Sequence, residues 1–396
     1  MKKIMAVNAG SSSLKFQLLE MPSEVVITEG IIERIGLDDA YYTIKFNGEK
    51  KKEILPVANH GVAVEILLQD LIEKNIIKNL NEISGIGHRI VHGGEKFDQS
   101  VLVTDDVIKE ITALCDLAPL HNPAHLVGIE AFRKALPNVE QAVIFDTAFH
   151  QTMNKETYLY ALPYEWYEKY GIRKYGFHGT SHEYVANEAA RLIGKPIEEL
   201  NIVTLHLGNG ASIAAIKGGK VIDTSMGLTP LEGIPMGTRS GNIDPAILEF
   251  VAKKENLTLS EVTNILNKKS GYLGISGTSH DSRDLEDGMD AGDERCKLAL
   301  DIQYKRIADY IGSYYIQLGG IDAFVFTAGI GENSHRCREE ILNRVKVLGV
   351  EVDYEANNVR GKTRLITTKD SKIKAFLIPT NEELVIARDT LRLTSK

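Results

Sequence analysis

The chain has 396 residues, more than the ~250–300 that one hydrophobic core usually serves, so we expect about two domains. Its 43% hydrophobic and 25% charged residues are typical of a globular α/β protein and exclude a disordered chain. The formal net charge of −8, with Lys and Arg scattered along the sequence, excludes a basic surface for nucleic acid.

The first 150 residues predict a β-meander that leads into alternating helices and strands. Turn residues separate the apolar runs, and the spacing of Val62, Ile66 and Leu67 is typical of one helix face. The predicted strands are 4–8, 13–20, 25–32, 40–46, 83–91 and 142–146, and the predicted helices are 62–74, 104–115 and 125–135.

The pattern restarts near residue 202, which predicts a second domain similar to the first. Strands are predicted on both sides of a turn at Gly218-Gly219, then at 323–328 and 374–379. Helices are predicted over 245–253 and over 294–318, where Gly319-Gly320 ends the second. A further helix is predicted to begin at a capping box formed by Thr258 and Glu261. In the long helix a packed face is predicted for Leu298, Ile302, Ile307, Ile311, Tyr314 and Leu318.

The sequence indicates a cytoplasmic protein without a membrane partner. Cys115, Cys296 and Cys337 are odd in number and lack a CxxC spacing, which favours buried thiols in a reducing compartment. The apolar run after Lys2-Lys3 ends at Asn8, too early for a signal peptide. No run reaches the ~18 apolar residues of a membrane span.

Two hairpin turns of small residues are candidates for holding phosphate. The first is Asn8–Ser13, and the second is Gly208–Gly210, within the apolar stretch 201–216. Glycine allows positive φ and close approach, while Ser, Asn and Lys15 add donors or charge. Two such hairpins predict two halves that grip one nucleotide, and ordinary hairpin turns are the alternative.

The better-known nucleotide motifs are missing. Gly361-Lys362-Thr363 ends like a phosphate-binding loop, but Ala356 stands where its first glycine is needed. His88-Arg89 is followed by Ile90, where a protein kinase would have its catalytic Asp. Any nucleotide is therefore expected at the paired hairpins.

Zinc is disfavoured, although three pairs of histidines have the spacing of a helical metal site. The first pair lies on a predicted strand, and Pro123 and Gly179 interrupt the other two. His178 instead precedes a helix predicted from about residue 180, whose N-terminus favours an anion. A structural histidine is the alternative. The pairs are His88/His92, His121/His125 and His178/His182.

Two arginines and two carboxylates complete the candidate site. Arg89 and Arg239 stand among glycines, where a guanidinium is free to bind a carboxylate or phosphate with two hydrogen bonds. Asp146 and Glu382 follow predicted strands, a position common for Mg²⁺ ligands in phosphoryl transfer. Surface arginines and solvated loop carboxylates are the alternatives.

These residues together resemble the short-chain acyl kinase family, which includes the acetate kinases, within the actin, sugar-kinase and heat-shock-chaperone ATPase superfamily. The resemblance covers essentially the whole chain. Its most specific stretches are VNAGSSSLKF at 7–16, GHRIVHGG at 87–94, FDTAFHQ at 145–151, YGFHGTSH at 175–182, TAGIGEN at 327–333 and PTNEE at 379–383.

The resemblance implies an α/β fold of two similar actin-like (ribonuclease H-like) domains facing a central cleft. The first, 1–150, would be rejoined by a C-terminal helix over 383–396, and the second, 151–382, would carry the nucleotide and form a homodimer. It also implies reversible, direct in-line transfer of the ATP γ-phosphoryl to acetate, with Mg²⁺ as the cofactor and Mn²⁺ as its substitute. A carboxylate nucleophile is already ionised at neutral pH, so no catalytic base is assigned.

The resemblance also assigns roles to single residues. Arg89 and Arg239 would hold the carboxylate and the phosphoryl, His178 and Arg239 would stabilise the transition state, and Asp146 would help catalysis. Glu382 and Asn8 would hold Mg²⁺, with Asp146 as a further ligand. The ATP-binding set would be Asn8, Ser11, Ser13, Lys15, His206, Leu207, Gly208, Asn209, Gly210, Asp281, Ser282, Arg283, Gly329, Ile330, Gly331 and Asn333, and the methyl pocket would be Val91, Leu120, Phe177 and Pro230.

One departure and two alternatives remain. Asn242 stands where the family pattern has Asp, which puts the order of the loop around Arg239 in question. A propionate or butyrate kinase is the nearest alternative, although the branched Val91 favours acetate because it leaves less room. A nucleotide-gated scaffold on the same fold is disfavoured because it has no carboxylate for Arg89 and Arg239 to bind.

Overall fold

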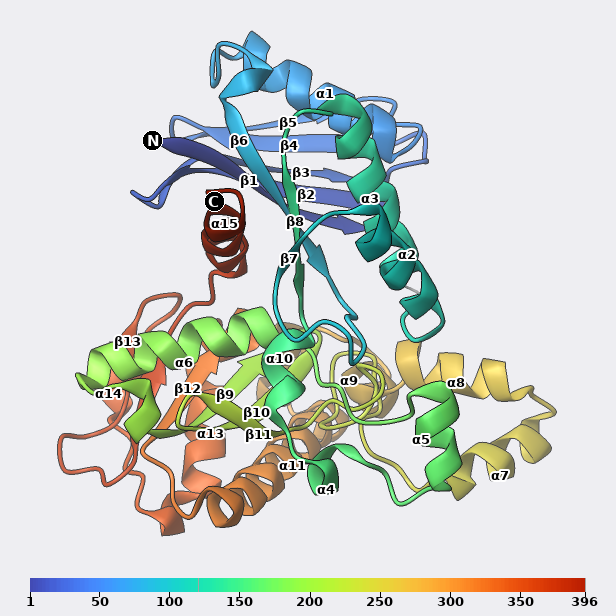
Figure 1. Ribbon diagram of the computed structural model, residues 1–396. Helices are drawn as coiled ribbons and strands as arrows, with labels where there is room; N and C mark the ends of the chain where they lie inside the picture. The colour runs from blue at the N-terminus through green and yellow to red at the C-terminus, as the bar shows by residue number, and fades with distance from the viewer. Residues whose placement is uncertain (120, 396) are drawn as a thin grey trace. The chain divides into compact units, whose positions relative to one another are not determined.

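The computed structural model describes residues 1–119 and 121–395, which form two compact units (Figure 1). Unit 1 is Met1–Phe149 together with the C-terminal stretch that begins at Asn381, and unit 2 is His150–Thr380. Among the described residues, no helix is both long enough and apolar enough to cross a lipid bilayer.

Unit 1 is built on a mixed sheet with the strand order β5-β4-β3-β2-β1-β6-β8-β7. Strands β1 to β5 form an antiparallel meander, β6 and β8 run parallel to β1, and β7 is antiparallel to β8. The bounds are β1 Lys2–Gly10, β2 Ser13–Met21, β3 Val25–Glu33, β4 Tyr41–Phe46, β5 Glu49–Ile54, β6 Ile83–Ile90, β7 Val101–Leu102 and β8 Gln141–Phe145.

Helices cover this sheet, and α15 brings the end of the chain back to it. Helix α15 packs against β1 and β6, where a Cβ at Gly87 would collide with Ile386 and Thr390. Glycine on β6 therefore allows the helix to approach closely. The bounds are α1 His60–Glu73, α2 Asp105–Ala113, α3 Asn122–Ala135 and α15 Glu382–Leu393, with short 3₁₀ turns at Leu80–Glu82, Leu114–Asp116 and Ala148–Thr152.

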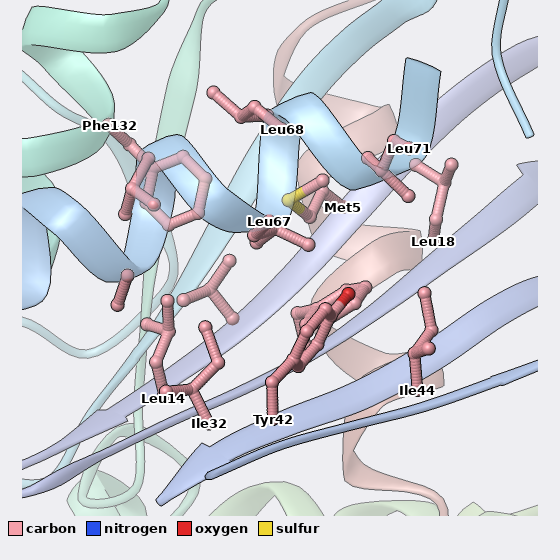
Figure 2. Close-up of a cluster of buried hydrophobic side chains, with 14 of the residues drawn as sticks. Met5, Leu14, Leu18, Ile32, Tyr42, Ile44, Leu67, Leu68, Leu71 and Phe132 are labelled. Atoms are coloured by element: carbon pink, nitrogen blue, oxygen red, sulfur yellow. The ribbon is translucent and has the colours of Figure 1, made fainter. Parts of the chain in front are cut away.

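The core of unit 1 lies between the sheet and the helices α1 and α3. Figure 2 shows its side chains pointing inward from both layers. Because side chains alternate across a strand and recur every three or four residues on a helix, one face of each element supplies them. The labelled members are Met5, Leu14, Leu18, Ile32, Tyr42 and Ile44 from the strands, Leu67, Leu68 and Leu71 from α1, and Phe132 from α3.

Unit 2 repeats the strand connections of unit 1. Its sheet has the order β11-β10-β9-β12-β14-β13, in which β9 to β11 are antiparallel and β12 and β14 run parallel to β9. The bounds are β9 Asn201–Leu207, β10 Ala211–Lys217, β11 Lys220–Thr224, β12 Ala323–Thr327, β13 Arg364–Leu365 and β14 Lys374–Leu377.

Local signals determine where several helices of unit 2 begin and end. Thr258 and Glu261 form the predicted capping box of α8, and Gly319 ends α11 at a φ of 77°. The bounds are α4 Lys155–Tyr158, α5 Tyr164–Tyr170, α6 Gly179–Ile193, α7 Ala246–Glu255, α8 Leu259–Lys268, α9 Gly271–Ser276, α10 Ser282–Asp290, α11 Glu294–Leu318, α12 Ala328–Asn333, α13 His335–Arg344 and α14 Tyr354–Asn357, with 3₁₀ turns at Ile197–Glu199 and Lys346–Leu348.

The structure corrects several sequence expectations. The strand predicted over 374–379 ends at Leu377, and Cys115 is only partly buried, whereas a buried thiol was expected. Strand β5 was not predicted, because its six residues are all exposed and show no apolar alternation. The strand predicted over 323–328 ends one residue earlier, since Ala328 begins α12 with a φ of 64°. On α11, Leu298 is 51% exposed, whereas Ile307 and Ile311 are buried as predicted.

Candidate active site

Arg89 and Asp146 form a two-point ion pair in unit 1. Strands β6 and β8 are parallel neighbours, so the end of one presents Arg89 beside Asp146, which directly follows the other. Arg89 donates from Nε to Oδ1 over 2.9 Å and from Nη2 to Oδ2 over 2.7 Å. Asp146 is only 1% exposed, so solvent screens this pair weakly. Both Asp146 oxygens therefore accept a hydrogen bond from Arg89.

Further charges surround this pair. Burial alone would lower the pKa of Arg89, but Asp146 and Glu382 outweigh it and raise the pKa. Burial raises the pKa of Glu382, which begins α15, and nearby Asp146 and Glu383 raise it further against the opposing effect of Arg89. Glu383 is also ion-paired with Lys15. Unit 1 thus gathers three carboxylates around one partly buried guanidinium.

The first hairpin turn lies next to these charges in the sheet. Asn8 lies near the end of β1, opposite Lys15 on β2, and Ser11 is exposed at the turn. The Gly10 carbonyl lies 2.7 Å from His60 Nε2, which ties the turn to α1. Ser13 begins β2, so four of the predicted phosphate contacts belong to one hairpin.

Two histidines of unit 1, His88 and His125, are buried in settings that lower their pKa, and neither was assigned a role from the sequence. Burial lowers the pKa of His88 to about 4, and its Nε2 lies 2.8 Å from Gln141 Oε1. Burial and then Arg89 lower the pKa of His125, on α3, to about 3. A neutral ring beside a cation avoids charge repulsion. This is a structural explanation for two of the six paired histidines.

The second hairpin lies where two candidate site residues of unit 2, Arg239 and His178, come close together. Gly208, Asn209 and Gly210 connect β9 to β10. A Cβ at Gly210 would lie 3.3 Å from Arg239 Nη1 and 3.7 Å from His178 Nε2. Glycine at this position therefore lets a guanidinium and an imidazole converge on one bare stretch of backbone, the arrangement expected where an anion is held.

His178 is held in an uncommon backbone conformation at the start of α6. Its φ of 59° lies in the left-handed region, which costs energy for a residue with a side chain. Nδ1 lies 2.8 Å from Ser212 Oγ on β10. The ring stacks on His206, with centroids 4.0 Å apart and an interplanar angle of 18°. Packing and this hydrogen bond fix the direction of the ring.

Arg239 lies in a loop that hydrogen bonds hold firmly. Its Nη1 donates to the Pro230 carbonyl over 3.3 Å, and burial lowers its pKa. Asn242 Oδ1 accepts from Gly233 N–H over 2.8 Å, and Nδ2 donates to the Tyr310 hydroxyl over 2.9 Å. An asparagine at this position thus orders the loop around Arg239, because it both donates and accepts.

A cavity of about 550 Å³ lies beside the second hairpin within unit 2. This volume is within the range of small-molecule sites, ~300–1,000 Å³. Arg283 and Asp281 form an ion pair at its edge, and the hydrogen bond from Arg283 lowers the pKa of Asp281 to about 2. The lining consists of Gly208, Asn209, His280, Asp281, Ser282, Arg283, Glu286, Gly329, Ile330, Asn333, Ser334 and Arg360.

Eight of these lining residues were expected from the sequence, and four were not. No local sequence motif marks the other four, which are His280, Glu286, Ser334 and Arg360. Three expected residues, His206, Leu207 and Gly331, are buried instead and do not line the cavity. His206 stacks on His178. Leu207 belongs to β9 in the sheet, and the Gly331 carbonyl accepts a hydrogen bond from buried Arg338 over 2.8 Å.

The residues expected around the methyl group belong to both units. Val91 follows β6 in unit 1 and is 7% exposed. Phe177 and Pro230 belong to unit 2, where Phe177 is buried and its carbonyl lies 2.8 Å from His150 Nε2. Leu120 lies outside the described residues.

The donor set in unit 1 fits Mg²⁺ better than zinc. Carboxylate and amide oxygens suit Mg²⁺, and Glu382 and Asn8 supply them. Glu382 lies in a setting that raises its pKa, which a bound cation would relieve. Arg89 occupies both Asp146 oxygens, which makes Asp146 a partner of Arg89 before it is a metal ligand. Within the described ranges no three His, Cys, Asp or Glu side chains form a preassembled metal cluster.

Comparison with known proteins places the whole chain in one family. The model of the acetokinase family matches residues 3–388. Acetate kinase of Anoxybacillus flavithermus is 58% identical over all of both chains, and acetate kinase of Bacillus subtilis is 58% identical over 99% of this chain and all of that protein.

Solved structures agree with this match. Acetate kinase of Porphyromonas gingivalis superposes with a TM-score of 0.95 at 44% identity, and a propionate kinase of Francisella tularensis with 0.94 at 42%. Each likeness covers 99% of this chain and all of the other. The predicted fold class of two α/β domains of the actin-like ATPase type is thereby confirmed. The chain belongs to the acetokinase family.

Proposed function

We propose that this protein transfers a phosphoryl group reversibly between ATP and acetate, giving ADP and acetyl phosphate. The observation that carries the proposal is the convergence of Arg239 Nη1 and His178 Nε2 on Gly210, beside a cavity of nucleoside size. Acetate kinases at 58% identity over the full chain support the same reaction. In this reading the cavity takes the adenosine and the glycine hairpin lies along the phosphates.

The chemistry needs alignment and charge neutralisation more than it needs a base. Acetate is ionised at neutral pH, so its carboxylate attacks the γ-phosphorus directly while the bond to ADP breaks. Arg239 and His178 would donate to the equatorial oxygens of the transferring phosphoryl, where negative charge is spread. Because the ring and the guanidinium are already held in place, little reorganisation accompanies the reaction.

Arg89 would bind the acetate carboxylate. Asp146 uses Nε and Nη2 of Arg89, which leaves Nη1 to a substrate oxygen. The raised pKa keeps the guanidinium charged at every working pH. The ion pair thus sets the direction of the guanidinium before substrate arrives, which lowers the entropic cost of binding.

Mg²⁺ would be held by Glu382 and Asn8, with Asp146 nearby, and Mn²⁺ would take the same oxygen ligands. When bound, the ion neutralises charge on the phosphates. Lys15 and the serines Ser11 and Ser13 would add donors along the same phosphates. Asn8 and Lys15 face each other across the hairpin, so both reach the same edge of the sheet.

The assay that tests the proposal traps acetyl phosphate with hydroxylamine. Purified protein with ATP, Mg²⁺ and acetate is expected to form acetyl hydroxamate, and no product at all would contradict the proposal. Propionate and butyrate in parallel assays test the alternative that the solved propionate kinase raises. Val91, whose branched side chain leaves less room at the acyl chain, favours acetate.

We also propose a homodimer in the cytoplasm. Ile247 and Phe250 on α7 and Leu259 on α8 are 43%, 64% and 65% exposed, and α7 packs against α8. Exposed apolar side chains on adjacent helices support an interface between copies. The three free cysteines support a reducing compartment. Light scattering after gel filtration is expected to give about twice the mass of one chain, and Phe250→Glu is expected to reduce it.

A further inference from the structure

A chain of four hydrogen-bonded side chains leads from His178 into the core of unit 2. Nδ1 of His178 lies 2.8 Å from Ser212 Oγ, which lies 2.7 Å from Nε2 of His182. Nδ1 of His182 in turn lies 2.7 Å from Thr204 Oγ1. Ser212, His182 and Thr204 are each 0% exposed, so water does not compete for these bonds.

The number of protons in this chain allows only two arrangements when both rings are neutral. Ser212 has one hydroxyl proton and lies between two ring nitrogens, so it donates to one ring and accepts from the other. A neutral imidazole likewise has one donor and one acceptor nitrogen. The proton position on His178 is therefore coupled to the proton positions on Ser212, His182 and Thr204.

Only one of the two arrangements suits a group that must donate to a phosphoryl oxygen. If Thr204 donates to His182 Nδ1, His182 Nε2–H donates to Ser212, and Ser212 donates to His178 Nδ1. His178 then carries its proton on Nε2, the atom that approaches Gly210. In the reverse arrangement Nε2 would be a bare lone pair facing negatively charged oxygen.

We propose that Ser212 and His182 are positioning residues that hold the proton of His178 on Nε2, so that this ring donates to the transferring phosphoryl while it remains uncharged. The proposal rests on the proposed function in one respect, the identity of the acceptor. It extends that function by assigning to two buried polar residues a task that packing alone does not require.

The surroundings of the chain favour neutral rings. Arg239 Nη1 and His178 Nε2 approach the same point at Gly210, so a second positive charge on His178 would be repelled. His206 stacks on His178, and His150 lies against His182 with ring centroids 5.7 Å apart. Burial lowers the pKa of His182 well below its usual range, and His150 and His206 lower it further.

His206, which stacks on His178, also has a serine hydroxyl within hydrogen-bond distance of its Nδ1. Ser181 Oγ, on α6, lies 2.8 Å from Nδ1 of His206. A hydroxyl that donates to Nδ1 again leaves the proton on Nε2. Serine therefore accompanies Nδ1 of both rings that lie along the second hairpin.

The proposal is tested by reading the tautomer of His178 directly. Two-bond ¹H–¹⁵N spectra of the full chain labelled in histidine distinguish protonated from bare ring nitrogens, and His178→Gln assigns the signal. We expect wild-type His178 to be neutral at pH 7.5 with its proton on Nε2. A proton on Nδ1, or a doubly protonated ring, would overturn the proposal, and this measurement needs no other variant to fold.

Three substitutions sharpen the test. Ser212→Ala is expected to mix the two His178 tautomers and to lower kcat roughly 10-fold with KM little changed, as for other partners that orient a functional imidazole. Thr204→Val is expected to keep the proton on Nε2, since a buried bare nitrogen costs less than a buried N–H without an acceptor. Ser225→Ala, which removes another fully buried hydroxyl that accepts from Ile213 N–H, is the control and is expected to leave the His178 signal and kcat unchanged.

The outcomes separate this inference from the proposed function. A wild-type protein that forms no acetyl hydroxamate contradicts the function, whereas the tautomer signals still report the direction of the chain. An unchanged His178 signal or unchanged kcat in Ser212→Ala overturns the inference. A His178 proton that moves to Nδ1 in Thr204→Val also overturns it, because Ser212 and His182 would then not hold the proton on Nε2 by themselves.

Discussion

Asp146 holds Arg89 through two hydrogen bonds, 2.9 Å from Nε and 2.7 Å from Nη2, across the ends of two adjacent parallel strands. The pair is 57 residues apart in sequence, and its carboxylate is buried. Such a two-point contact fixes the plane of the guanidinium as well as its position. A lysine would keep the charge and lose the geometry.

Arg89→Lys is therefore expected to lower kcat/KM for acetate by roughly 10²-fold, about 3 kcal/mol, and Arg89→Ala by at least as much. The measurement is the steady-state rate of acetyl hydroxamate formation with acetate varied. Arg133→Lys is the matched control, because that arginine pairs with Asp105 and Glu130 on the surface of the same unit. Wild-type kinetics in Arg89→Lys would remove Arg89 from the site.

Arg239→Ala is expected to lower kcat by roughly 10²-fold or more, because one donor to a developing charge is worth about 3 kcal/mol. The protein should remain folded, since loop hydrogen bonds that hold Asn242 and Gly233 do not use the guanidinium. Arg306→Ala, an exposed arginine on α11, serves as the control. The proposed role fails if a folded Arg239→Ala protein keeps its kcat.

Glu382→Ala is expected to raise the Mg²⁺ concentration for half-maximal rate by about 10-fold or more, as the loss of a carboxylate ligand should. Asp146→Ala is expected to be worse, because it also leaves Arg89 without its partner. The measurement is a magnesium titration of the rate at saturating ATP and acetate. Asp106→Asn, an exposed carboxylate of unit 1, is the control. Titrations of both variants that superimpose on wild type would contradict the metal assignment.

Glu382→Gln is expected to stabilise the metal-free protein at neutral pH. The folded pKa of Glu382 is raised, so the folded state binds this proton more tightly than the unfolded state. Ionisation of Glu382 therefore lowers stability as pH rises from the unfolded value, about 4.3, through the folded value. The difference in melting temperature between variant and wild type should grow as pH increases through that window. A difference in melting temperature that is constant with pH would show that folding does not raise the pKa of Glu382.

Val91→Ala is expected to shift the ratio of kcat/KM for propionate over acetate by roughly 10-fold in favour of propionate, the scale of one methylene in an apolar pocket. The change should appear mainly in KM, because contact with the alkyl tail is made in ground state and transition state alike. Val143→Ala, a fully buried valine of β8, is the control for lost packing. An unchanged ratio would make Val91 a core valine and would remove the preference for acetate.

Features governed by neighbours a few residues apart were readable from the sequence. The capping box at Thr258, the end of α11 at Gly319 and the start of α6 beside His178 all appear where they were predicted. Each depends on hydrogen bonds or backbone angles within one turn of helix, so local residue types are enough. The family motifs supplied the rest of the candidate residues, because they mark positions without needing their coordinates.

The tertiary structure decided which distant side chains meet. Asp146 becomes the partner of Arg89 only because β8 lies next to β6, and His178 reaches Arg239 only because both approach Gly210. Glu286 and Arg360 line the cavity without any local pattern, and the chain from His178 to Thr204 joins α6 to β10 and β9. These contacts depend on strand order and packing, whose energies sum over the whole unit, and no short window of sequence contains that sum.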